Sequence, residues 1–227
     1  MRQEALILVG SVALLSTIYL WADRATVDVG DLHRAPGDPA SERVAVLRDA
    51  PPVPRNGSYV RSGIDADGTI HVTQWIRSRR GIHGLTIALP IASSGTSPAA
   101  SDLRLVDGTG GDQRPVGPVG SSPAVVSFLV PVHVVRLSYV LTGTVTVSPS
   151  APGRALADPV SLEVDPSTGA RGPRTVEVTG THVLNLACGS EAGTELEPCG
   201  RPGSDGWSTT LRATEHDRVV AQLDFGP

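Results

Sequence analysis

The chain begins with an uninterrupted apolar run. Ala5–Ala22 contains 18 residues without a charged side chain and is closed by Asp23. As a helix it would span about 27 Å, close to the ~30 Å hydrocarbon core of a bilayer. Tyr19 and Trp21 lie at its far end, where aromatic side chains favour the headgroup level. The pattern predicts a single N-terminal transmembrane helix within residues 1–22.

A cleaved signal peptide is the alternative for this run. Signal sequences carry about 7–15 apolar residues and end in a small-x-small cleavage site. Here the run is longer, and bulky Tyr19 and Trp21 stand where small residues are needed. We therefore favour an uncleaved, single-pass anchor in the cell membrane. Because the run is N-terminal and signal-like, we expect the bulk of the chain to be extracytoplasmic.

After the anchor the apolar pattern stops. Residues 23–57 are interrupted by repeated Gly and Pro, which break long helices because Pro removes a backbone donor and fixes φ. This composition predicts a stalk or linker.

From residue 58 onward, short alternating segments predict β-strands. Tyr59–Ile64 and Ile70–Ile76 flank Asp65–Thr69, whose Asp-Gly pair is a strong hairpin signal. Further segments of this kind are Gly84–Ile91, Leu103–Val106, Ala124–Val130, Val134–Val147, Val160–Val164, Thr175–Val178, His182–Cys188, Ser208–Ala213 and Arg218–Phe225. With no amphipathic helical window, they predict an all-β fold, an antiparallel β-sandwich over residues 58–227.

Composition narrows the protein class. The 227 residues are 40% hydrophobic and 19% charged, with a net charge of -4, and all the basic residues other than histidine are arginines. Gly and Pro number 25 and 19, which is too few for a disordered or collagen-like chain. The mild acidity disfavours nucleic acid as a partner.

Cys188 and Cys199 are the only cysteines. In an oxidising compartment, an isolated pair eleven positions apart predicts a structural disulfide. The alternative is a metal or redox site, but there is no CxxC spacing, and two thiols do not complete a zinc site.

No motif for catalysis, metal binding or cofactor binding is present. The six histidines fit no ligand pattern; they are His33, His71, His83, His133, His182 and His216. Ser204 and Ser94 lie in ordinary turn sequences rather than in a nucleophile elbow. We therefore expect no enzymatic activity, no catalytic, cofactor-binding or metal-binding residues, and no cofactor.

One cationic cluster, Arg77, Arg79 and Arg80, follows the second predicted strand. Guanidinium groups suit phosphates and carboxylates, so this cluster is a candidate contact for lipid headgroups or for an acidic wall polymer. The simpler interpretation, which we prefer, is a solvated hairpin end.

The order of these features resembles the exported N-terminal domain of a membrane protein family, the domain of unknown function 2207. The matching stretches are Asp67–Gln74, His83–Pro90, Tyr139–Gly143, the cysteine pair and Asp217–Phe225. Gln74 replaces an acid of that family's pattern, and Thr86 and Ile87 stand where it has Tyr-Arg. The resemblance implies an exported β-domain, and it supplies no catalytic residue because the family has no established activity.

These observations predict a non-enzymatic interaction module of the bacterial cell envelope. Its partners would be the membrane, through the Ala5–Ala22 helix, and another envelope or membrane protein. One alternative is an accessory subunit of a membrane complex that docks through its N-terminal helix. A second is an envelope hydrolase whose site is not visible in the sequence.

Overall fold

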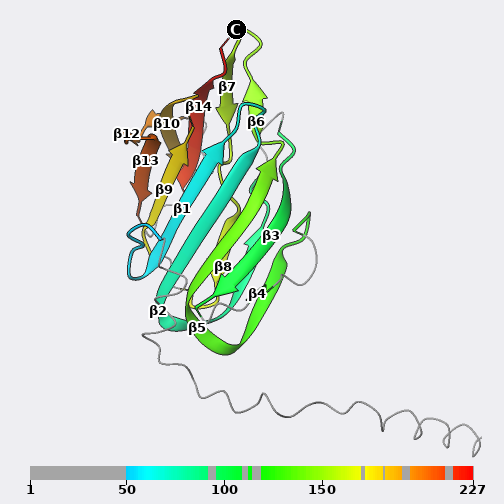
Figure 1. Cartoon of the computed structure of the whole chain (residues 1–227), viewed down its shortest axis with the longest axis vertical. Coiled ribbons are helices and arrows are strands. Elements are labelled where there is room, and N and C mark those ends of the chain that lie inside the picture. The colour runs from blue at the N-terminus through cyan, green and yellow to red at the C-terminus, as the bar shows by residue number, and fades with distance from the viewer. Residues whose placement is uncertain are drawn as a thin grey trace, which may run out of the picture. The chain divides into compact units, whose positions relative to one another are not determined.

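The computed structural model describes residues 50–91, 96–108, 112–113, 119–169, 172–180, 182–190, 195–212 and 217–226 (Figure 1). Every regular element in these ranges is a β-strand, and the strands form two sheets. The all-β class expected from the sequence is confirmed. None of the described residues forms a helix long and apolar enough to cross a membrane, and the predicted anchor Ala5–Ala22 lies outside them.

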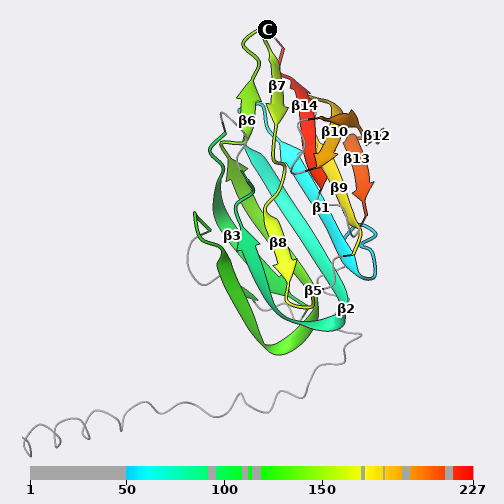
Figure 2. The same ribbon diagram turned by 180° about the vertical axis from the view of Figure 1, so that it is seen from behind.

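The large sheet has nine strands in the described ranges. In spatial order they are β12 (Arg201–Pro202), β13 (Gly206–Leu211), β9 (Arg174–Thr179), β1 (Gly57–Ile64), β2 (Ile70–Ala88), β5 (Ala124–Thr142), β3 (Ala99–Asp107) and β4 (Asp112–Gln113), with β8 (Glu163–Pro166) paired to β2. The small sheet has the order β11 (Glu197–Pro198), β10 (Val183–Ser190), β14 (Asp217–Asp224), β7 (Arg154–Ala157) and β6 (Val145–Val147). Figure 2 shows the same strands from behind.

The predicted first hairpin is confirmed. Strands β1 and β2 pair antiparallel up to Ile64 opposite Ile70, and the turn between them is closed by a bond from the Asp65 N–H to the Thr69 carbonyl at 2.9 Å. Gly68 has a φ of 83°, in the left-handed region that glycine adopts without strain. The Asp-Gly signal therefore marks this turn correctly.

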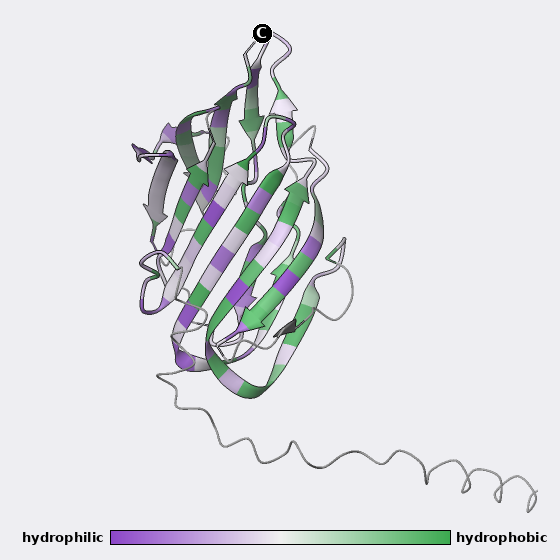
Figure 3. Cartoon of the chain, in the orientation of Figure 1, coloured by the Kyte–Doolittle hydropathy of each residue, from purple (hydrophilic) through white to green (hydrophobic). Residues whose placement is uncertain are grey.

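Two expected pairs of short strands are single long strands. Strand β2 joins the segments expected at Ile70–Ile76 and Gly84–Ile91. Strand β5 continues from Ala124 past residue 130 to Thr142. It ends where Gly143, with a φ of 71°, turns the chain into β6 of the small sheet. Figure 3 shows hydrophobic and hydrophilic residues alternating along both strands. Bulges interrupt the pairing of β2 with β5, and in the sequence these interruptions resemble turns between separate strands.

The antiparallel sandwich expected from the sequence needs a correction in its pairing. Strand β1 pairs antiparallel with β2 on one side and parallel with β9 on the other, with Ser58 opposite Arg174. The large sheet is therefore mixed. Hydrophobic alternation identifies a strand and its buried face but contains no information on the direction of its neighbour.

Both sheets contribute to one hydrophobic core, which includes Val72 and Leu137 of the large sheet and Leu186 and Leu223 of the small sheet. The segment between β7 and β8 enters this core. The Ser62 hydroxyl donates to the Val160 carbonyl at 2.7 Å, and the Leu162 N–H donates to the Tyr139 hydroxyl at 2.8 Å. These bonds hold the connection between the sheets against the large sheet.

Candidate anion-binding surface

The predicted arginine cluster lies inside β2 and not after a strand. Arg77 is opposite Val134 and Ile82 is opposite Val132, so four residues, Ser78 to Gly81, face a single residue of β5. This β-bulge turns Arg79 and Arg80 out of the ladder, and both side chains are exposed. The expectation of a hairpin end is wrong at this position because strand pairing resumes on both sides of the bulge.

Two hydrogen bonds shape the bulge. The Ser78 side chain is buried, and its hydroxyl accepts the Arg80 N–H at 3.1 Å. On β5, the His133 Nδ1 lies 3.2 Å from the Ser78 carbonyl oxygen, a distance at which a protonated Nδ1 donates to it. The local backbone therefore fixes where the two arginines leave the sheet.

Arg77 is separated from this pair and faces outward from the regular part of the sheet. It shares that face with Arg136, which is opposite Trp75, and with Arg104, which is opposite Ser138. Arg136 is thus diagonal to Arg77 on one neighbouring strand and to Arg104 on the other, at spacings of about 7–8 Å. We call these three side chains the outer arginine face.

Sequence reasoning missed two members of this face. Arg104 and Arg136 each stand alone at a polar position of an alternating strand, and nothing local connects them. The only signal in the sequence was that each arginine is next to a residue of the buried face, Leu105 or Leu137, and therefore points to the opposite face of the sheet. The register of three strands was needed to bring them together.

The face gathers three arginines in a chain of net negative charge. Within the described residues, the outward positions of β2 and β5 beside these arginines carry no carboxylate, and none of the three arginines forms an ion pair. On the β3 side, the exposed Asp102 lies two residues before Arg104 and accepts the Ser101 hydroxyl at 3.3 Å, and Asp112 of β4 is opposite Val106. Elsewhere on the sheet the pattern differs. Arg61 bonds Glu177 at 2.6 Å, and this hydrogen bond raises the pKa of Arg61. At about 7 Å in water, two like charges repel by about 0.6 kcal/mol, which an anion would relieve.

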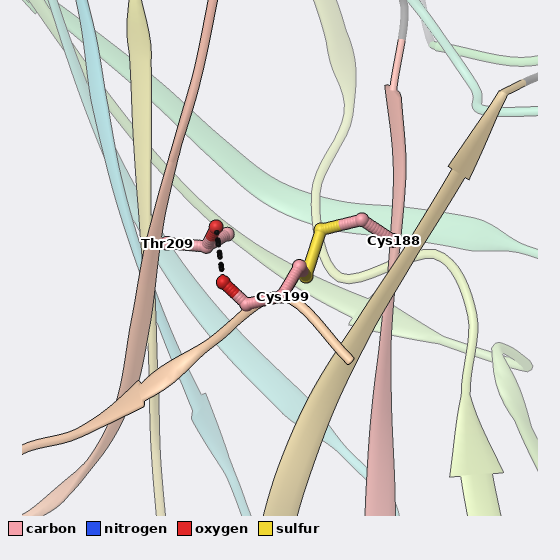
Figure 4. The surroundings of a disulfide bond; sticks show 3 residues. All are labelled: Cys188, Cys199 and Thr209. Carbon is pink, nitrogen blue, oxygen red and sulfur yellow. Dashed lines mark hydrogen bonds between the residues drawn. A yellow bond between two sulfur atoms is a disulfide. The ribbon is translucent and has the colours of Figure 1, made fainter. Parts of the chain in front are cut away.

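The predicted disulfide is present. Cys188 lies on β10 and Cys199 follows β11, with their Cα atoms 5.6 Å apart (Figure 4). The Cys199 N–H donates to the Leu186 carbonyl at 3.1 Å, and its carbonyl accepts the Thr209 hydroxyl of β13 at 3.0 Å. The bridge therefore fixes the point at which the chain passes from the small sheet to the large one.

The histidines do not converge in the described part of the chain. His71 lies 3.1 Å from Asp65 at the first hairpin, and His182 Nδ1 lies 3.1 Å from the Asp224 carbonyl. His83 is exposed on β2, while His33 and His216 lie outside the described residues. No group of three or more metal-ligating side chains occurs among the described residues.

An open groove of about 550 Å³ lies beside the turn between β12 and β13. Its lining includes Trp207, Asp205 and Ser204, and the Ser204 hydroxyl donates to Asp205 at 3.2 Å. No histidine is among the described residues that line it, so Ser204 has no imidazole base there. The groove contains no nucleophile–base pair of the kind that a serine hydrolase uses.

No family model and no curated protein matches the chain, so the resemblance to the domain of unknown function 2207 stays a prediction. Some solved structures are similar. An aminopeptidase N family protein from Idiomarina loihiensis has a TM-score of 0.46 at 11% identity, over 72% of this chain and 29% of its own. A mutant M1 zinc metallopeptidase from Deinococcus radiodurans, bound to a Tyr-Ser-Ala substrate, has a TM-score of 0.35 at 13% identity, over 73% of this chain and 41% of its own. Native leukotriene A4 hydrolase from Saccharomyces cerevisiae has a TM-score of 0.36 at 5% identity, over 74% of this chain and 28% of its own.

These likenesses correct the function expected from the sequence. The similar solved proteins are enzymes, so we withdraw the expectation of a non-enzymatic interaction module and its variant as an accessory subunit. The chain spans less than half the length of each of them. With TM-scores below 0.5, the likenesses assign no activity, metal or substrate to this chain.

Proposed function

We propose that this chain is a membrane-tethered, extracytoplasmic domain that binds a phosphate-bearing polymer across its outer arginine face. The observation that carries the proposal is the diagonal row of Arg77, Arg136 and Arg104 over three adjacent strands, and none of these arginines forms an ion pair among the described residues.

The chemistry of the face supports a polymer rather than a single small anion. Guanidinium groups match phosphate oxygens with two parallel hydrogen bonds. The three side chains cross two strand intervals of about 4.8 Å each. Arg104 is exposed, and Arg77 and Arg136 are half-buried beside the outer cluster that Ala50 and Val53 cover. A chain with repeated negative charges can contact all three at once.

Two features support the proposed location. The apolar run Ala5–Ala22 has the length of a membrane span. The disulfide between Cys188 and Cys199 is of a kind that persists in oxidising compartments. Envelope polymers that bear phosphate would be accessible to a domain tethered there.

Binding of inorganic polyphosphate by the full chain in detergent tests the proposal. Fluorescence anisotropy should show binding that weakens with salt, because counterions are displaced. The variants Arg104→Ala and Arg136→Ala should each bind about fivefold more weakly, since an exposed charge pair contributes up to about 1 kcal/mol. Arg104→Lys should recover most of the affinity.

The matched control is Arg154→Ala, on β7 of the small sheet, which should bind like the wild type. Equal affinities for the wild type and the Arg104→Ala, Arg136→Ala double variant would refute the proposal. A neutral dextran should not bind to any variant.

A further inference from the structure

The bend of the large sheet carries a second bulge, on β5, next to the one that holds Arg79 and Arg80. Ile82 is opposite Val132 and Gly84 is opposite Ser127, so Phe128 to Pro131 face His83 alone. Phe128 remains buried, whereas Leu129 and Val130 have exposed fractions of 105% and 70%. Figure 1 shows both long strands bending at the end of the domain opposite the C-terminus.

The two bulges touch each other. A Cβ atom added to Gly81 would lie 2.6 Å from the Pro131 Cβ, so only glycine fits between the strands at this point. Because of this close approach, exposed arginines and exposed aliphatic side chains lie at one end of the domain. We call Arg79, Arg80, Leu129 and Val130 the apex.

The chain enters the domain at the same end. Ala50 and Val53 pack on a small outer cluster that includes Trp75 and Val134, and Val134 is opposite Arg77, the last paired residue before the first bulge. In the sequence, residues 23–49 connect the apolar run Ala5–Ala22 to this point. A chain held in a bilayer by that run would reach the domain at the apex end.

The side chains of the apex are of the kind that bind the surface of an anionic membrane. Aliphatic side chains beside arginines suit the boundary between acyl chains and anionic headgroups, where cationic side chains are attracted within a Debye length. Two aliphatic residues expose far less area than the ~800 Å² per partner of a stable protein interface. We propose that the apex docks on an anionic lipid surface, with Leu129 and Val130 inserted and Arg79 and Arg80 at the phosphates.

A single introduced thiol tests the docking in the full chain. Both cysteines of the sequence are in the disulfide, so Leu129→Cys can be labelled selectively with an environment-sensitive dye. The chain is reconstituted in phosphatidylcholine vesicles with and without 30% phosphatidylglycerol, and spin-labelled lipids serve as quenchers. The matched control is Val147→Cys, since Val147 is also exposed, at 62%, but lies on β6 of the small sheet.

We expect strong quenching at position 129 in the anionic vesicles only, and none at position 147. Adding Arg79→Glu and Arg80→Glu to the labelled Leu129→Cys chain should remove the quenching, while adding Arg104→Ala should not. This last control separates the apex from the outer arginine face, so either proposal can fail alone.

Equal quenching at the two positions, or equal quenching in neutral and anionic vesicles, would overturn the inference. A dimer in detergent that dissociates on Leu129→Asp substitution would also overturn it, because a second copy of the chain would then cover the apex.

Discussion

Replacing Tyr139 with Phe probes the bond that holds the connection between the sheets in the core. The Tyr139 side chain is only 3% exposed, and its hydroxyl accepts the Leu162 N–H at 2.8 Å. Phenylalanine keeps the ring but leaves a buried N–H without its acceptor, and an unsatisfied buried donor costs about 1–3 kcal/mol. We expect the free energy of unfolding to fall by about 2 kcal/mol at neutral pH.

The same substitution should change the response to alkali. Burial raises the pKa of Tyr139 well above the ordinary value of about 10, so the folded state holds the phenolic proton where the unfolded state releases it. The contribution of this group to the free energy of unfolding is therefore fully present below about pH 10 and is lost as the pH rises further. The variant lacks this loss, so its deficit relative to the wild type should shrink above pH 10.

Urea unfolding of the full chain in mild detergent, followed by circular dichroism, measures both effects. The midpoint should fall at an unchanged m-value. The control is Tyr59→Phe, because the Tyr59 hydroxyl donates to a partly buried Glu177 that keeps its bond to Arg61, and we expect a cost below about 1 kcal/mol. A Tyr139→Phe protein within about 0.5 kcal/mol of the wild type would show that Leu162 finds another acceptor, and our reasoning on this bond would be wrong.

Two further outcomes can be checked directly. Thiol labelling of the denatured chain should detect no free thiol before reduction and two after it, and Cys188→Ser should lower the free energy of unfolding by about 2–4 kcal/mol; two labelled thiols before reduction would contradict this. At the first hairpin, the Thr69 N–H donates to Asp67 at 2.9 Å and lowers the pKa of this carboxyl group, so its stabilisation is present above its unfolded pKa and is lost as the pH falls. Asp67→Asn should therefore reduce the loss of stability at acidic pH, which circular dichroism measures during a pH titration. An unchanged loss at acidic pH would show that Asp67 does not contribute to it.

How far the sequence predicts the fold depends on the range of each signal. The Asp-Gly turn is local, and the hairpin it predicts is present with Ile64 opposite Ile70. The second half of β5 was expected to continue to Val147, but Gly143 redirects the chain into the other sheet. Glycine in an alternating segment does not tell whether the chain bulges, bends or changes sheets.

The candidate surfaces were less accessible to sequence reasoning. Arg77, Arg79 and Arg80 attracted attention because they are adjacent, yet the bulge divides them between two surfaces. Arg104 and Arg136 join Arg77 only through cross-strand register, which depends on tertiary pairing. The aliphatic side chains of the apex looked like a buried strand, because Ala124–Val130 is almost entirely apolar.

The parallel pairing of β1 with β9 also has a kinetic consequence. Ser58 and Arg174 are 116 positions apart, and β1 lies in the interior of the large sheet. During synthesis, β1 and β2 can meet early, but the other edge of β1 has no neighbour until β9 emerges near residue 180. Closing so long a loop makes folding slow compared with proteins of local contacts. A nascent chain ending near residue 169 would expose that unpaired edge, so truncation there should yield an aggregating product rather than a smaller domain.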